Sequence, residues 1–284
     1  MKLPLLAQRL FNTPLAIHPR KAEIVVAALA ERLGISHIST DCAAWTGGED
    51  EFSRPARDSG YDVVGGVAVI PVEGTLVHKL GSLRPYSGMT GYDGIRQTFL
   101  GALADPAVGA ICLDIDSPGG EVAGCFDLVD LIYQARGEKP IHAILTEGAY
   151  SAAYAIASAA DRIIVPRTGG VGSIGVIMIH CDFSQQIKDD GIKVTIVKFG
   201  SRKMEVNTLT PLSDEARAAV QHDVDETGEL FVNTVARNRG LSASVIRDTQ
   251  GATFTASEGV ALGLADEINA PDAAFLNLLT LTEN

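Results

Sequence analysis

The feature that most constrains the fold is a regular alternation of short apolar runs and longer helical patterns between residues 67 and 198. The apolar runs predict strands at residues 67–72, 108–115, 141–145, 163–165 and 193–198. The segments between them predict helices at residues 91–104, 121–136, 151–160 and 182–190. Strands that alternate with helices form mostly parallel sheets, joined by right-handed crossovers. The sequence therefore predicts an α/β fold with a mostly parallel sheet.

Helical patterns also flank this region. Apolar positions repeat at helical spacing in residues 21–33, and residues 42–62 are rich in Gly, Asp, Glu and Ser, as in a linker. These patterns predict a helical N-terminal arm with its linker at residues 1–62, and a single domain at residues 63–270. The residues after Pro271 are weakly patterned, and we expect a short C-terminal tail at residues 271–284.

The C-terminal third of the domain predicts a helical extension. Ser213 is placed to cap a long helix that runs to about Asn238, and Gly240 to end it. A last unit follows, with a helix at residues 242–248, a strand at 252–254 and a helix from Ser257.

Composition argues against several classes of function. The net charge of −12 argues against nucleic acid as a partner, because phosphate binding needs a basic surface. The four cysteines, Cys42, Cys112, Cys125 and Cys181, are far apart and have no histidine cluster nearby. This spacing argues against both a disulfide framework and a zinc site. We expect Cys112 and Cys125, which sit in apolar segments, to be small buried hydrophobic residues.

Nothing in the sequence predicts a membrane segment. The apolar run at the N-terminus is interrupted by Arg9 and is too short for a signal peptide. No stretch approaches the roughly 18 apolar residues needed to cross a bilayer. We therefore expect a soluble, cytoplasmic protein.

Ser151 is the first candidate catalytic residue. It stands where the strand at 141–145 leads into an Ala-rich helix, at the carboxyl edge of the predicted sheet. Helix N-termini present free N–H groups and a partial positive charge, so the N–H of Ala152 can face a developing oxyanion. By itself the position also fits a packing residue or a helix N-cap.

The segment Asp116-Ser117-Pro118-Gly119-Gly120 is a candidate oxyanion loop. It follows a buried strand and precedes a helix, and its glycines allow close approach of the backbone to a ligand. A preorganised N–H of Gly119 or Gly120 is worth about 3–4 kcal/mol of barrier in such a site. An ordinary turn between a strand and a helix has the same composition.

Lys203 is the candidate base, 52 residues after Ser151. A free lysine has a pKa near 10.4 and is protonated at neutral pH, but burial lowers this value by up to roughly 3–5 units. A neutral lysine is a recognised activator of serine in place of histidine. A solvated lysine in a polar loop is the plain alternative.

Other motifs give weaker candidates. The six histidines lie in unrelated contexts, and none belongs to a recognisable triad motif. The glycine run at residues 169–176 lacks the Lys-Ser/Thr of a phosphate-binding loop and the downstream acid of a dinucleotide fold. We interpret this run as close backbone packing, or as an extended edge that pairs with a peptide.

Four ordered motifs carry a resemblance: Asp116–Gly120, Gly148–Tyr154 with the following Ala-Ser-Ala-Ala-Asp, Gly172–Val176 and Gly200–Lys203. At these residues, and from about Val67 to Ile268, the chain resembles the signal peptide peptidase A family of serine peptidases. That family lies within the Clp-protease/crotonase superfamily.

The resemblance implies a Clp/crotonase-like fold and a catalytic dyad of Ser151 and Lys203. It also implies an oxyanion hole formed by Gly119 or Gly120 together with Ala152. It implies no metal and no cofactor, and a homo-oligomeric ring in which neighbouring subunits complete each site.

Two further segments refine the resemblance. Residues 9–17 and 83–92 are most similar to the head-maturation (capsid assembly) proteases of lambda-type tailed phages. This implies cleavage of scaffold, portal and the protease's own chain inside the immature capsid, in the cytoplasm of a bacterial host.

Three other functions stay open from the sequence. A crotonase-type acyl-CoA enzyme shares the fold and the oxyanion hole but needs no nucleophilic serine. A capsid or scaffold component can keep the fold without activity. A cellular peptidase that degrades signal peptides has the same motifs.

Overall fold

The computed structural model describes residues 12–30 and 59–282 of the chain. The predicted linker at 42–62 lies largely outside these residues, as does the end of the helix predicted at 21–33. The described part of that helix is α2 (Pro19–Ala30), which confirms a helical segment near the N-terminus.

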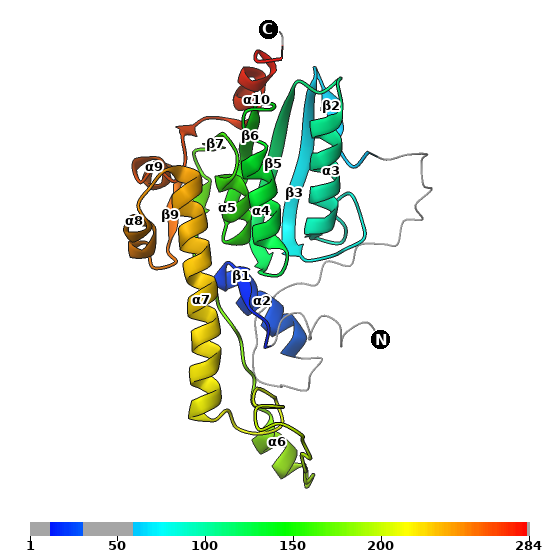
Figure 1. Ribbon diagram of the computed structural model, residues 1–284, viewed down its shortest axis with the longest axis vertical. Coiled ribbons are helices and arrows are strands. Elements are labelled where there is room, and N and C mark those ends of the chain that lie inside the picture. Colours follow the sequence, from blue (N-terminus) through cyan, green and yellow to red (C-terminus); the bar gives the residue numbers. More distant parts are fainter. Residues whose placement is uncertain (1–11, 31–58, 283–284) are drawn as a thin grey trace.

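A mostly parallel sheet forms the centre of the domain, as the alternation predicts (Figure 1). Its strand order is β10-β7-β6-β5-β3-β2. Five of these strands run parallel, and β2 pairs antiparallel with β3 at one edge. Their bounds are β2 (Asp62–Val64), β3 (Val67–Val77), β5 (Ala110–Glu121), β6 (Ile141–Tyr150), β7 (Arg162–Val165) and β10 (Glu267–Ile268).

Helices cover both faces of this sheet. The main core joins one face to α3 (Tyr92–Ala104), α4 (Cys125–Gln134) and α5 (Ala152–Ser158). The opposite face carries a smaller apolar cluster, in which Ala274 and Leu278 of α10 (Pro271–Leu279) meet alternate residues of the strands. The structure thus shows a packed helix where the sequence suggested a weakly patterned tail, with Pro271 at its first turn.

The central strands run further than the apolar runs predict. The β3–β5 register shifts between Glu73 and Thr75, and the β5–β6 register shifts between Ile115 and Ser117. Beyond these irregularities the strands continue and take new partners. The added strands are β1 (Leu15–Ile17) on β5, β4 (Met89–Gly91) on β3, β8 (Gly170–Gly172) on β6, and β9 (Thr253–Thr255) on β8.

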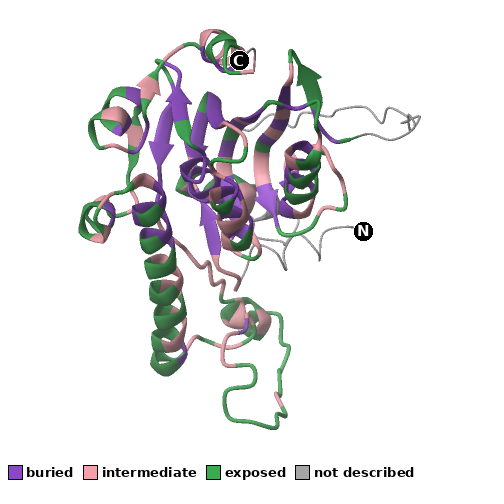
Figure 2. Cartoon of the chain, turned by 45° about the horizontal axis from the view of Figure 1, so that its top comes forward, coloured by how far each residue is buried: buried purple, intermediate pink, exposed green. Residues whose placement is uncertain are grey.

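The long helix predicted after Ser213 is α7 (Asp214–Arg239). The Ser213 side chain accepts a hydrogen bond from the Ala216 N–H, and Gly240 ends the helix in the left-handed region with a φ of 66°. Buried residues cluster at the C-terminal end of α7, beside α5 and α8 (Ala243–Asp248). The N-terminal part runs out from the body toward α6 (Ser184–Asp189) and is largely exposed (Figures 1 and 2).

The strand predicted at residues 193–198 is wrong for the single chain. The structure assigns no strand there, although the pattern of β-branched residues favours one. Val197 and Phe199 are 93% and 101% exposed, and the segment pairs with no strand among residues 12–30 and 59–282. Extended segments need such a partner to form a sheet.

Arg136 ties the ends of two helices together. Its guanidinium donates hydrogen bonds to the carbonyl oxygens of Ser158, Ala159 and Ala160, at the end of α5, and to that of Asn238 near the end of α7. A cation is favourable at a helix C-terminus, where the last carbonyl groups have no partner within the helix. Arg136 therefore holds the C-terminal end of α7 against α5.

Replacing Arg136 with Met should lower the free energy of unfolding by about 2–4 kcal/mol, because several carbonyl groups lose a charged donor. Urea denaturation followed by circular dichroism measures the change. Arg96→Met, at an exposed position of α3, is the matched control and should change stability little. Equal stability of the two variants would contradict this role for Arg136.

Candidate active site

Ser151 occupies a strained turn between β6 and α5. Its φ of 55° and ψ of −120° lie in a region that non-glycine residues rarely adopt, and such strain is typical of functional sites. The Ser151 N–H donates to the Gly172 carbonyl oxygen at 2.8 Å, and its carbonyl oxygen accepts from the Ala155 N–H at 2.9 Å. These bonds fix the turn from both sides.

The Ser151 side chain is not used to cap the helix. It stands at the N-cap position but makes no capping hydrogen bond. Its Oγ donates instead to the Gly175 carbonyl oxygen at 3.4 Å, and the residue is fully buried. Ser151 therefore occupies the N-cap position without capping the helix through its side chain. Every residue of α5 is buried, and its alanines let the helix lie close on the sheet.

The turn with the sequence Asp-Ser-Pro-Gly-Gly forms part of β5 rather than a free loop. Within it, the Ser117 hydroxyl donates to the Gly74 carbonyl oxygen at 2.6 Å and accepts from the Gly119 N–H at 3.1 Å. The Gly119 N–H is thus already bonded inside the turn. Gly120 lies so close to Leu76 that any added Cβ would collide with the Leu76 backbone.

This turn lies directly beside Ser151. A Cβ added to Gly119 would lie 2.8 Å from the Tyr150 carbonyl oxygen and 3.0 Å from the Ala152 nitrogen. Gly119 also has a φ of 93°, which favours glycine. The structure therefore brings together three of the predicted elements, namely Ser151, the Ala152 nitrogen and the two glycines.

Lys203 is not part of this cluster within one chain. It is exposed, in the segment that joins α6 to the start of α7. In Figure 1 that segment lies near α6, at the opposite end of α7 from the part that packs against α5. Neighbouring Arg202 pairs with Glu205 at 2.8 Å on the same exposed turn.

The segment Ser173–Ile177 borders the site, and it overlaps the glycine run at residues 169–176 that the sequence suggested as close backbone packing or an edge that pairs with a peptide. Ser173 is buried and has a φ of 55°, the same unusual value as Ser151. Its N–H donates to the Ala252 carbonyl oxygen at 2.7 Å. The sequence Gly172-Ser173-Ile174-Gly175, in which the serine directly follows a buried strand, is the signal that marks this turn.

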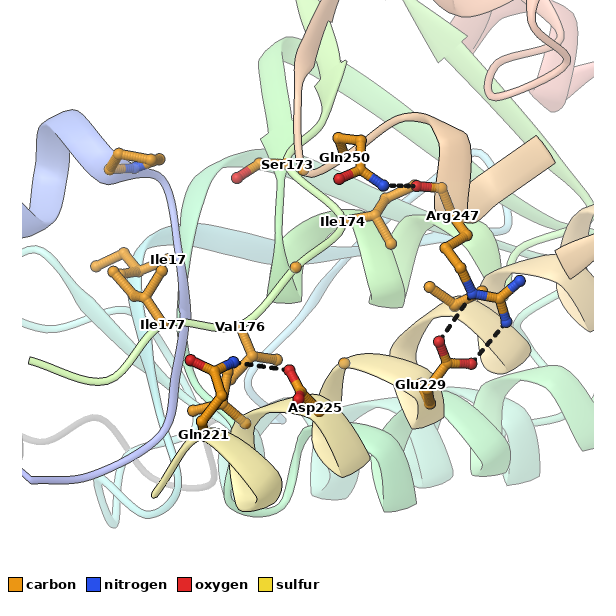
Figure 3. A pocket seen from close by; sticks show the side chains of 16 residues that line it. Ile17, Ser173, Ile174, Val176, Ile177, Gln221, Asp225, Glu229, Arg247 and Gln250 are labelled. Atoms are coloured by element: carbon orange, nitrogen blue, oxygen red, sulfur yellow. Dashed lines mark hydrogen bonds and ion pairs between the residues drawn. The ribbon is translucent and has the colours of Figure 1, made fainter. Parts of the chain in front are cut away.

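A cavity of about 710 Å³ opens between this segment and α7 (Figure 3). Gly175, which accepts the Ser151 hydrogen bond, lies in its wall together with Ser173. The far wall carries an ion pair between Arg247 and Glu229 at 2.7 Å. The cavity therefore leads from the surface of α7 toward the carbonyl group that holds the Ser151 hydroxyl.

Two other reactive side chains lie near the site. The Cys125 Sγ contacts the Ala152 carbonyl oxygen at 3.9 Å, and burial raises the pKa of this thiol to about 12, so it stays neutral. The His18 ring packs edge-on against Tyr150 with centroids 5.2 Å apart, and burial followed by the charge of Arg20 lowers the pKa of His18. Both Cys112 and Cys125 are buried, as predicted.

Residues 12–30 and 59–282 contain no group of three or more His, Cys, Asp or Glu side chains arranged to hold a metal ion. Among the same residues, no helix combines the length and apolar character that a membrane crossing requires.

Comparison with known proteins assigns the chain to a peptidase family. Residues 134–283 match the sequence profile of Peptidase family S49. The chain belongs to Peptidase family S49. The matched region contains both Ser151 and Lys203, whereas the Pro-Gly-Gly turn lies before it.

The chain is 40% identical to "Head-tail preconnector protein GP5" of Enterobacteria phage P21, over 96% of this chain and 57% of that protein. It is also 40% identical to "Capsid assembly protease C" of Escherichia phage lambda, over 95% of this chain and 64% of that protein. A "Putative signal peptide peptidase SppA" of Enterococcus faecium is 26% identical over 61% of this chain and 51% of that protein. The chain thus spans about three fifths of the length of the two phage relatives.

Gly120→Ala tests the close packing of the turn. The added Cβ meets the Leu76 backbone, so the strands must separate, and we expect a loss of about 1–3 kcal/mol in unfolding free energy. Gly228→Ala is the matched control, because an added Cβ there meets nothing within 4 Å. It lies inside α7 and should gain about 0.5–1 kcal/mol. Thermal denaturation measures both, and a neutral Gly120→Ala would contradict the packing argument.

Proposed function

We propose that this protein is a serine endopeptidase in which Ser151 is the nucleophile and Lys203 the general base. The observation that carries the proposal is the strained, fully buried Ser151 turn beside the Pro-Gly-Gly segment, in a chain of Peptidase family S49. An acyl-CoA enzyme of crotonase type needs no nucleophilic serine, so the strain at Ser151 favours the peptidase.

In the proposed reaction, Ser151 Oγ attacks the peptide carbonyl carbon while the neutral amine of Lys203 accepts the hydroxyl proton. The backbone N–H of Ala152 and that of Gly120 stabilise the tetrahedral oxyanion. We favour Gly120 over Gly119, because the Gly119 N–H already donates to Ser117. Lys203 then protonates the leaving amine, and water hydrolyses the acyl-enzyme. The reaction needs no metal and no cofactor.

We further propose that Lys203 reaches Ser151 from a neighbouring copy of the chain. A lysine acts as a base only where burial lowers its pKa, and Lys203 is exposed in its own chain. The same segment exposes Val197 and Phe199 almost completely. Apolar side chains this exposed mark a contact surface. A homo-oligomeric ring of Clp/crotonase-like subunits supplies that contact and buries the lysine.

The proposed substrates are proteins of phage capsid assembly, namely scaffold, portal and the chain itself, cleaved inside the immature capsid in the bacterial host cytoplasm. The similarity to the phage lambda protein named "Capsid assembly protease C" supports this setting. Neither nucleic acid nor a membrane takes part in the proposed reaction.

Subunit complementation tests the shared site. Ser151→Ala and Lys203→Ala should each lower the rate of peptide cleavage by 10⁴-fold or more. When both variants are expressed together, about a quarter of the interfaces in a ring pair an intact serine with an intact lysine. The mixed assembly should therefore recover roughly a quarter of the original rate.

Lys188→Ala is the matched control for the lysine. Lys188 is exposed on the neighbouring helix α6, outside the segment that carries Val197 and Phe199. Its loss should leave the cleavage rate unchanged. A mixed assembly as inactive as each variant alone would contradict the shared site, and full activity of Lys203→Ala would contradict the base.

A further inference from the structure

The N-terminal strand β1 lies across the candidate active site. On one side it pairs antiparallel with the end of β5, with Ala16 opposite Gly120 and Ile17 opposite Gly119. On the other side Leu15 and Ile177 exchange two backbone hydrogen bonds of 2.8 and 2.9 Å. The chain's own residues therefore fill a groove between the Pro-Gly-Gly turn and the segment that follows the glycine run.

The register places a carbonyl group of β1 at the proposed oxyanion donor. The His18 N–H donates to the Pro118 carbonyl oxygen at 2.7 Å, and the Val122 N–H donates to the Pro14 carbonyl oxygen at 3.4 Å. Hydrogen-bonded pairs alternate along an antiparallel ladder, so Ala16 and Gly120 form the pair between these two. In that pair the Gly120 N–H donates to the Ala16 carbonyl oxygen.

The same carbonyl oxygen lies near the second proposed donor. A Cβ added to Gly119 would collide with the Ala16 carbonyl oxygen and would lie 3.0 Å from the Ala152 nitrogen. Both atoms therefore border one small space beside Gly119. This is the place that the carbonyl group of a scissile peptide bond occupies in the proposed reaction.

The side chains of β1 alternate as those of a bound extended peptide do. Ala16 is fully buried in the main core, so its position has room for a small side chain only. Leu15 and Ile17 face the other way and pack with Ala22, Ile177 and Ile179. Sheet edges recognise extended peptides in the same way: they form backbone hydrogen bonds with the peptide and provide pockets for its alternate side chains.

The site is closed while β1 is in place. Ser151 is fully buried, and the His18 ring packs on the adjacent Tyr150. A second peptide cannot form the same ladder with β5, because β1 already uses those backbone groups.

We propose that residues 12–18 are a built-in pseudosubstrate, which occupies the peptide-binding groove with Ala16 in the position that precedes the scissile bond. The proposal rests on the proposed peptidase function, and it specifies the kind of peptide that the site binds. The groove binds an extended apolar peptide with a small residue at the Ala16 position, and the arm must leave before a protein substrate enters.

Peptide binding to an inactive protein tests this directly. The probe is a fluorescent peptide with the sequence of residues 11–20, and anisotropy measures its affinity for the full-length Ser151→Ala protein. Adding Leu15→Asp places a charge in the apolar cluster under β1 and should release the arm. We expect the peptide to bind the double variant at least tenfold more tightly than Ser151→Ala alone.

Two matched controls accompany the test. Ile24→Asp makes the same kind of change at a side chain of α2 that is 50% exposed, and should leave the peptide affinity as weak as in Ser151→Ala alone. A probe peptide with Trp at the position of Ala16 should lose its binding, because that side chain faces the closed core. Ile17→Asp provides a second way to release the arm if Leu15→Asp lowers the melting temperature.

Equal binding to the arm-intact and arm-released proteins, or no binding to either folded release variant, would overturn the pseudosubstrate. So would equal affinity for the Ala and Trp peptides. The measurement needs neither Lys203 nor turnover, so its outcome is separate from that of the complementation experiment. Tight, size-selective binding with failed complementation would keep the peptide groove and reject only the shared dyad.

Discussion

The site depends on the hydrogen bonds of one buried hydroxyl group, that of Ser117. Its Oγ joins the Gly74 carbonyl oxygen on β3 to the Gly119 N–H on β5, at the level where both strand pairings shift register. This link lets β5 continue as a strand through Pro118 and two glycines, in place of an open loop. The extended end of β5 then positions the turn against Ser151 and offers a free edge to β1.

The conformation of Ser151 carries a cost that the rest of the structure offsets. A residue held in a sparsely populated region of φ and ψ costs about 1–3 kcal/mol. The hydrogen bond to Gly172, the fully buried α5 and the donors of Arg136 at the end of that helix hold the turn in place. Because backbone hydrogen bonds and packing already fix Ser151, its hydroxyl group is not needed to cap the helix.

Much of the fold followed from local patterns in the sequence. The alternation of apolar runs and helical patterns predicted the parallel sheet, and Ser213 and Gly240 predicted the bounds of α7 within a residue or two. The strand extensions were missed, because Gly and Pro at 118–120 have low strand propensity and only pairing with β1 and β3 makes the segment extended. The strand predicted at residues 193–198 is wrong for the opposite reason, since this segment has a strand pattern but no partner strand in the described part of the chain.

For the candidate site, the sequence predicted the cluster of Ser151, Ala152 and the glycines, which are close in space because parallel strands end at one sheet edge. It did not predict the occupation of the groove by residues 12–18, because that contact joins segments about a hundred residues apart. The exposure of Lys203 within its own chain agrees with the alternative that the sequence left open, a solvated lysine in a polar loop.

The proportions of α7 set a geometric condition for any assembly. Its 26 residues span about 39 Å, and apart from Ala216 its buried residues lie toward its C-terminal end. The helix therefore acts as a rigid spacer that carries the α6 region outward (Figure 1). Each added residue would rotate that region by about 100° around the helix axis and move it by about 1.5 Å. The length of α7 thus determines both how far the α6 region lies from the body of the protein and in which direction that region points.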